Sequence, residues 1–210
     1  MRERQCSHAQ SAAIAYTRMA ACAVPHASFY VPKDRPMARV RFIDTADTDE
    51  GKQLLDDIRR RRGGSLLNLD KVLMHSVPLA RGWNQFMGAV RRQTALDPAL
   101  REMAILRVAV LNDAPYEFMQ HAPDARSAGV SDAKIEGLKQ ATVDPAVFGV
   151  LEQQVLACAD AMTRTIRVPH AVFAPLRDAL GDAQMVELTL TIASYNMVSR
   201  FLEALEIEAE

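Results

Sequence analysis

A pair of helix-start signals, separated by about one helix length, constrains the fold of this chain most strongly. Asp97 precedes Pro98, and Asn112 precedes Pro115, so each segment offers a capping side chain followed by a proline at the first helical position. Apolar residues recur at helical spacing from about Thr48 onward, and no segment alternates as a half-buried strand would. The sequence therefore predicts an all-α fold whose short connections join antiparallel neighbours.

Glycines, prolines and capping residues set the expected helix boundaries. The pattern predicts helices over residues 49–62, 66–75, 78–94, 98–111, 112–129, 131–140, 145–164, 170–180 and 182–206. Segments 97–105 and 182–190 share an Asp cap, an apolar fourth residue and a Glu at the sixth. This similarity could mark an internally duplicated helical hairpin, or it could be chance resemblance between two capped amphipathic helices.

Composition narrows the function classes. The 210 residues are 49% hydrophobic with a formal net charge of -1, which argues against disorder and against electrostatic nucleic-acid binding. No apolar run reaches the roughly 20 residues that a membrane span requires. The arginines from Arg59 to Arg62 are interpreted as a solvated helix end. The cysteines Cys6, Cys22 and Cys158 are scattered, which disfavours a disulfide scaffold or a zinc site.

The N-terminal region differs from the rest. Residues 11–24 are alanine-rich and follow two arginines, which resembles a weak secretory or transit signal. Tyr16, Thr17 and Arg18 interrupt the apolar run, so a cytoplasmic protein with an N-terminal extension is the preferred interpretation. We expect residues 1–38 to be a flexible extension and residues 39–210 to form the helical domain.

The candidate site combines an imidazole with two carboxylates. Glu117 and His121 are four residues apart on one helix face, and Glu102 stands one helix earlier. Such groups can move protons near neutral pH. From spacing alone, a surface ion pair or a satisfied core histidine explains the pattern equally well. Arg107 lies in an apolar run, where it needs a carboxylate partner or an anionic substrate.

Three further residues are candidates for substrate contact, each with a structural alternative. His75 can cap a helix end, Trp83 can be core, and Tyr116 lies among apolar neighbours of the candidate helix. We predict no metal, because a di-iron bundle needs Glu-x-x-His from two helices and this chain offers one pair at a different spacing. No glycine-rich phosphate loop, serine elbow or Cys–His pair is visible, so no cofactor is predicted.

Several segments together resemble the carboxymuconolactone decarboxylase family, which includes the alkylhydroperoxidase D proteins. They are residues 66–69, 74–78, 96–109, 114–121, 125–131 and 195–201. The resemblance implies an alkylhydroperoxidase D-like helical bundle that assembles into trimers or hexamers, with a small-molecule site near a subunit interface.

The two branches of that family imply different chemistry. The peroxidase branch carries a Glu, a Cys-x-x-Cys and a His, which fall on Glu102, on Ala114 and Glu117, and on His121. Neither Ala114 nor Glu117 can act as the thiolate nucleophile. The decarboxylase branch has a Glu-Phe-x-x-His segment, which residues 117–121 match.

The resemblance therefore favours a cofactor-independent decarboxylase acting on a small carboxylated lactone or carbonyl compound. His121 would be the acid/base, Glu117 and Glu102 would support it, and Arg107 would hold a carboxylate. Two alternatives stay open. One is a peroxidase whose thiol comes from Cys158 or a partner protein, and the other is a non-catalytic helical oligomer with a binding pocket.

Overall fold

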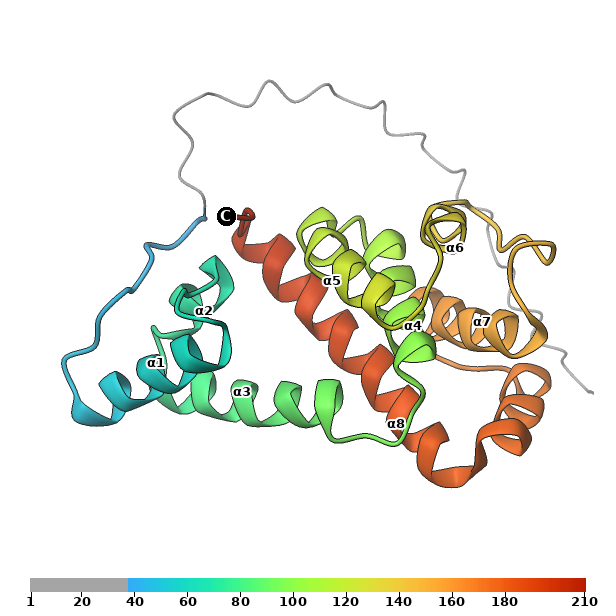
Figure 1. The fold of residues 1–210 in the computed structure, drawn as a ribbon, viewed down its shortest axis with the longest axis horizontal. Coiled ribbons are helices and arrows are strands. Elements are labelled where there is room, and N and C mark those ends of the chain that lie inside the picture. The colour runs from blue at the N-terminus through green and yellow to red at the C-terminus, as the bar shows by residue number, and fades with distance from the viewer. Residues whose placement is uncertain (1–37) are drawn as a thin grey trace, which may run out of the picture. The chain divides into compact units, whose positions relative to one another are not determined.

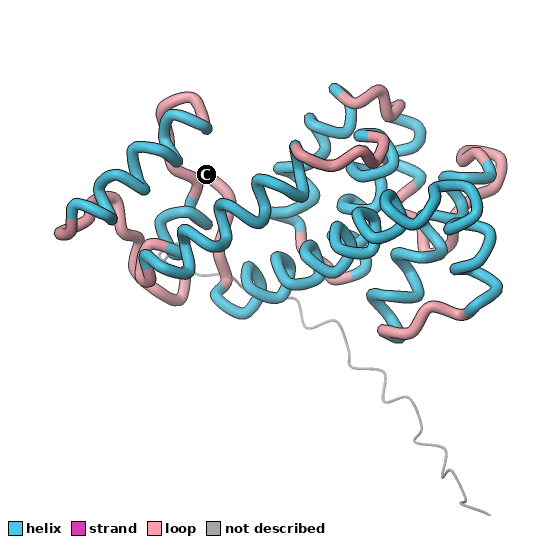
Figure 2. The backbone as a smooth tube through the Cα atoms, turned by 90° about the horizontal axis from the view of Figure 1, so that it is seen from below, coloured by secondary structure: helices cyan, strands magenta, loops and turns pink. Residues whose placement is uncertain are grey.

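The computed structural model describes residues 38–210, and these residues form eight helices and no strand (Figure 2). The predicted all-α fold is thereby confirmed. Residues 1–37 of the expected extension, with its signal-like segment and the cysteines Cys6 and Cys22, lie outside the described residues. Ala38, assigned to the extension, is buried in the helical domain. In order, the helices are α1 (Asp49–Arg61), α2 (Asn68–Leu73), α3 (Val77–Arg92), α4 (Pro98–Leu111), α5 (Pro115–Ser127), α6 (Asp132–Gly137), α7 (Val150–Thr165) and α8 (His170–Leu205).

Local signals explain where the central helices begin. Pro98 and Pro115 are the first residues of α4 and α5. The expected cap at Asn112 is wrong, because Asn112 is the C-cap of α4 and the N-cap of α5 is Ala114, which makes no side-chain cap hydrogen bond. The Asp97 side chain accepts hydrogen bonds from the backbone N–H groups of Ala99 and Leu100, which would otherwise lack partners at the helix start. The first turn of α4 is therefore set by its own sequence, and α5 shares the proline at its first position.

The predicted boundary at residue 145 is wrong, and the predicted break between residues 180 and 182 is confirmed. Residue 145 does not start a helix, because Asp144 accepts from the Ala146 N–H and forms a turn, and α7 begins only after Gly149. Gly181 has φ +74° and ψ 168°, which breaks the helical path inside α8 at the position where the sequence predicts two helices. A positive φ of this kind favours glycine.

Helix α4 is the centre of the fold. It packs against α5, α7 and α8 (Figure 1). Every residue from Glu102 to Ala109 is buried. Helices α1 and α2 pack on α3, and α3 in turn contacts the C-terminal part of α8, which runs diagonally between the two groups in Figure 1. This arrangement brings the C-terminal ends of α1 and α3 toward the start of α4. None of the helices described here combines the length and the apolar character that a membrane span needs.

Candidate proton-transfer site

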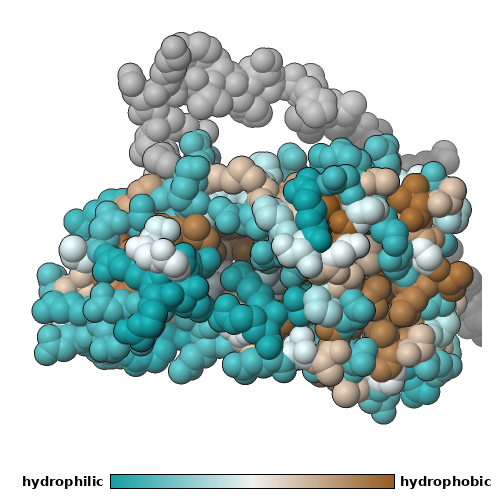
Figure 3. All heavy atoms as spheres, in the orientation of Figure 1, coloured by the Kyte–Doolittle hydropathy of each residue, from teal (hydrophilic) through white to brown (hydrophobic). Residues whose placement is uncertain are grey.

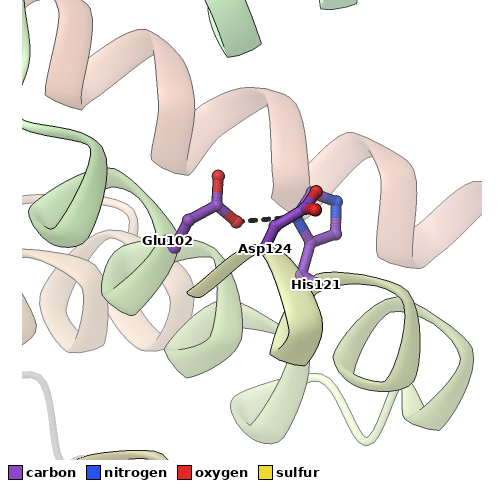
Figure 4. Close-up of side chains that lie close together, drawn as sticks. All are labelled: Glu102, His121 and Asp124. Carbon is purple, nitrogen blue, oxygen red and sulfur yellow. Dashed lines mark hydrogen bonds and ion pairs between the residues drawn. The ribbon is translucent and has the colours of Figure 1, made fainter. Parts of the chain in front are cut away.

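Glu102 and His121 meet inside the bundle. The His121 Nδ1 atom lies 2.8 Å from the Glu102 Oε2 atom, and both side chains are buried (Figure 4). Each residue lies in the second turn of a helix that begins at a proline, and α4 and α5 are consecutive, tightly packed helices. The two residues that the sequence singles out on separate helices are therefore direct partners.

A tyrosine and an arginine extend this contact. The Tyr195 hydroxyl lies 3.0 Å from His121 Nε2, and the two rings meet edge to face with centroids 4.9 Å apart. Arg91 donates from its Nε to the Tyr195 oxygen at 2.7 Å. These contacts join α3, α8, α5 and α4 in one chain of side chains, Arg91–Tyr195–His121–Glu102.

The hydrogen bonds in this chain have one direction. Because a guanidinium can only donate, Tyr195 accepts from Arg91, and its own hydroxyl hydrogen is available for donation to His121 Nε2. His121 then carries its proton on Nδ1 and donates it to the Glu102 carboxylate, which can only accept when ionised. Burial raises the pKa of Tyr195, against the opposing effect of Arg91, so the phenol stays protonated at rest. The chain of hydrogen bonds then runs from Arg91 through Tyr195 and His121 to Glu102.

A cleft of about 560 Å³ opens beside the chain, where α1 and α3 end and α4 begins. Glu102 and Arg91 line it, whereas His121 and Tyr195 lie behind its wall. Both ring nitrogens of His121 are already engaged. The sequence predicts His121 as the group that meets a substrate, but in the structure Glu102 is the member of the pair that faces the open space.

Glu117 is buried one helical turn before His121 without contacting it. Its Oε2 atom accepts from the Ser199 hydroxyl at 2.8 Å, and its Oε1 atom has no hydrogen-bond partner within residues 38–210. Burial raises the pKa of Glu117 to about 8, although Ser199 and Arg91 oppose the rise. This carboxyl group is therefore mostly protonated at neutral pH, and it forms no ion pair with His121.

Arg107 does not line the cleft, contrary to the expectation that it holds a substrate carboxylate. It is fully buried, and its Nε and Nη2 atoms donate to the two carboxylate oxygens of Asp160 at 2.6 and 2.9 Å. The remaining N–H groups reach the backbone carbonyls of Leu138, Gln140 and Ala141. All five donors of the guanidinium are occupied, so Arg107 fastens the segment after α6 to α4 and α7.

The other expected contact residues also lie elsewhere. The Tyr116 hydroxyl donates to Glu210 at 3.3 Å, and the Trp83 ring packs on Phe201 with centroids 5.4 Å apart. His75 is exposed and bonds the Arg41 carbonyl at 2.8 Å. None of the three lines the cleft beside Glu102.

The residues that sequence reasoning missed are Arg91, Tyr195 and Ser199. For Tyr195 and Ser199 the available signal was their place in the resembling segment 195–201.

Glu102, His121 and Asp124 bring three potential metal-ligand atoms within 4.8 Å of one another (Figure 4). Their surroundings suit a cation poorly. Arg101 lies 3.3 Å from the second Glu102 oxygen, both His121 nitrogens have partners, and Asp124 is exposed. A divalent ion would also have to enter a cleft whose walls carry several arginines.

Cys158 is the free cysteine of the described residues. It is fully buried on α7, and burial raises the pKa of its thiol to about 11. A thiol of this kind is almost entirely protonated at neutral pH and is shielded from solvent. Cys158 therefore lacks the properties of a reactive cysteine.

Comparisons with solved structures show the same fold. A structure described as an uncharacterized peroxidase-related protein from Silicibacter sp. TM1040 superposes with a TM-score of 0.72 at 18% identity, covering 85% of this chain and 95% of its own. An alkylhydroperoxidase AhpD core protein from Ralstonia eutropha JMP134, also described as peroxidase-related, gives 0.71 at 16% identity, with coverages of 84% and 94%. A protein of unknown function from Agrobacterium tumefaciens gives 0.60 at 20% identity and covers 65% of this chain and 93% of its own.

Part of the sequence also matches a protein family. No curated protein matches the sequence. Residues 78–161, which span α3 to most of α7 and include both Glu102 and His121, match the model of the carboxymuconolactone decarboxylase family. The match supports a function of the carboxymuconolactone decarboxylase or AhpD-like class at the level of the family. The segment that holds Glu102 and His121 is therefore similar to the carboxymuconolactone decarboxylase family, and the fold around it is similar to that of the peroxidase-related structures.

Proposed function

We propose that this protein is a cofactor-independent, carboxy-lyase-like enzyme that transfers protons on a small carboxylated lactone or carbonyl compound. The observation that supports this most is the directed chain Arg91–Tyr195–His121–Glu102, which ends on a carboxylate at a cleft wall. A purely structural ion pair would not need a one-way path for protons behind it.

The chain's own residues suffice for the proton step. When a carboxylate leaves as carbon dioxide, its bonding electron pair passes into a conjugated carbonyl, and a carbon atom must later gain a proton. The Glu102 carboxylate takes the His121 Nδ1 proton and delivers it to that carbon, while His121 Nε2 takes the Tyr195 proton. Arg91 then stabilises the phenolate, and solvent restores the proton.

Arginines of the cleft replace Arg107 as the groups that hold a substrate carboxylate. Arg101 and Arg91 line the cleft beside Glu102 itself. A guanidinium binds a carboxylate with two parallel hydrogen bonds, which fixes orientation as well as position. The reacting carbon can then lie next to the Glu102 oxygen.

The peroxidase alternative draws on the structural neighbours, two of which are described as peroxidase-related. It requires a thiolate near His121, and the structure offers no exposed thiol among residues 38–210. Turnover of an organic hydroperoxide with a dithiol reductant, lost in Cys158→Ser, would favour this alternative over proton chemistry.

The decisive experiment compares Glu102→Gln and Tyr195→Phe with the wild type on a panel of carboxylated lactones and keto acids. Carbon dioxide release and solvent deuterium incorporation are measured. We expect Glu102→Gln to lose about a hundredfold or more in kcat, and Tyr195→Phe to lose less and to shift the pH profile. Glu136→Gln, an exposed carboxylate on α6, is the matched control. If Glu102→Gln keeps full activity, or no substrate turns over while ligands still bind, the site is a binding pocket rather than this catalyst.

A further inference from the structure

The cleft beside Glu102 carries far more positive charge than one carboxylate needs. Five arginines line it, from the end of α1, the end of α3 and the first turn of α4: Arg61, Arg62, Arg91, Arg92 and Arg101. The carboxylates on the same walls are Glu102 and Asp124. Asp70, buried behind the wall, pairs with Arg62 through a 3.1 Å hydrogen bond. Three carboxylates against five guanidiniums leave an excess of two positive charges.

Several of these arginines have neutral partners or none. Arg91 donates to the Tyr195 hydroxyl and Arg61 to the Asn84 side-chain oxygen, so neither is neutralised by that contact. Arg92 is exposed and has no hydrogen-bond or ion-pair partner within residues 38–210. The pKa of Arg61 is lowered by burial and then by the charge of Arg62, with Arg92 and Arg91 adding to the effect. The cations thus repel one another across the cleft.

Helix C-termini favour cations, and this accounts for some of the arrangement at the ends of α1 and α3. It does not account for Arg101 in the first turn of α4, where the helix dipole disfavours a cation. Arg101 is nonetheless mostly buried, with 12% of its side chain exposed. The five side chains therefore converge from three helices on one space.

We propose that this cleft binds the phosphoryl group of a small phosphate ester, which is the substrate of the same site. A phosphoryl group offers two charges and three oxygens in different directions, matching guanidiniums that arrive from three helices. A carboxylate offers one negative charge and two coplanar oxygens, so it would neutralise only part of the excess positive charge. The inference rests on the proposed function in one respect, namely that the bound ester is what Glu102 acts on.

Calorimetric titration of the full chain at constant ionic strength tests the inference. The probes are inorganic phosphate and phenyl phosphate, with succinate as a dicarboxylate and acetate as a monocarboxylate. We expect both phosphates to bind saturably, and at least about tenfold more tightly than acetate or succinate, as one additional charge-assisted contact predicts. Succinate binding as tight as that of phenyl phosphate would overturn the choice of a phosphoryl group.

Arg92 provides the matched variant, because its side chain is exposed and lies outside the proton chain. Arg92→Ala should weaken phosphate binding at least about tenfold, and Arg177→Ala, an exposed arginine on α8, should not. Equal effects of the two variants, or no saturable binding by the wild type, would refute the inference.

Glu102→Gln separates this inference from the proposed function. The variant should retain phosphate binding and lose turnover. Failure of phosphate to bind, with Glu102-dependent turnover of unphosphorylated acids, would reject the phosphoryl site alone. Phosphate binding together with full activity of Glu102→Gln would reject the proton role alone.

Discussion

Glu117→Gln should make the protein more stable at neutral and alkaline pH. Glu117 is buried between α5 and α8, with one carboxyl oxygen bonded to Ser199 and the other without a partner in the described chain. Burial raises its pKa from 4.5 to about 8. The folded protein must therefore hold a proton that the unfolded chain releases, and glutamine carries no such requirement.

The size of the effect follows from the two pKa values. Each pKa unit is worth about 1.4 kcal/mol, so keeping Glu117 protonated at pH 7 costs the folded state about 3 kcal/mol. Below pH 4.5 both states are protonated and the cost vanishes. The contribution of Glu117 to stability is therefore full at low pH, declines as the pH rises above 4.5, and is lost once the pH passes about 8.

Urea unfolding of the wild type and of Glu117→Gln at pH 5, 7 and 8 measures this dependence. The difference in unfolding free energy should be under about 1 kcal/mol at pH 5 and reach about 3 kcal/mol at pH 7. Other titrating groups are shared by the two proteins and cancel in the difference. Glu136→Gln, at an exposed position, should show no such trend. A difference between wild type and Glu117→Gln that does not grow with pH would show that Glu117 is ionised and paired in the native protein.

Two further predictions concern the stability of the helical bundle and its assembly. Arg107→Met should lower the unfolding free energy by about 3–5 kcal/mol, because it leaves Asp160 and three carbonyls without their donor, whereas Arg177→Met should leave it nearly unchanged in the same urea titration. We expect the homo-oligomer that the family resemblance implies, a trimer or hexamer, to use the exposed apolar face of α8 formed by Val186, Leu190 and Met197. Leu190→Glu should therefore reduce the mass measured by light scattering, and an unchanged assembly would place the interface elsewhere.

The central contact could be predicted because its determinants are local. Pro98 and Pro115 set the starts of two consecutive helices, and these starts fix which face Glu102 and His121 present. Short connections then make the helices neighbours. The meeting of these two side chains needs nothing from distant parts of the chain.

The rest of the site depends on long-range packing, which the sequence does not reveal. Tyr195 is 74 positions from His121 and 104 from Arg91, so their contacts exist only because α8 passes between α3 and α5. Arg107 illustrates the same limit. The sequence shows a cation in an apolar run, but its partner Asp160 lies 53 positions away on α7. The sequence indicates that a buried cation such as Arg107 needs a partner, but it does not identify which residue that partner is.

The position of His121 has a consequence for which side chains this site can tolerate. The residue must donate from one atom toward Glu102 and accept at another atom from Tyr195, on opposite sides of a rigid ring. An asparagine could imitate the donor and a glutamine could imitate the acceptor, but neither flexible amide holds both atoms in place at once. Imidazole is the side chain that meets both demands, so position 121 has no conservative replacement.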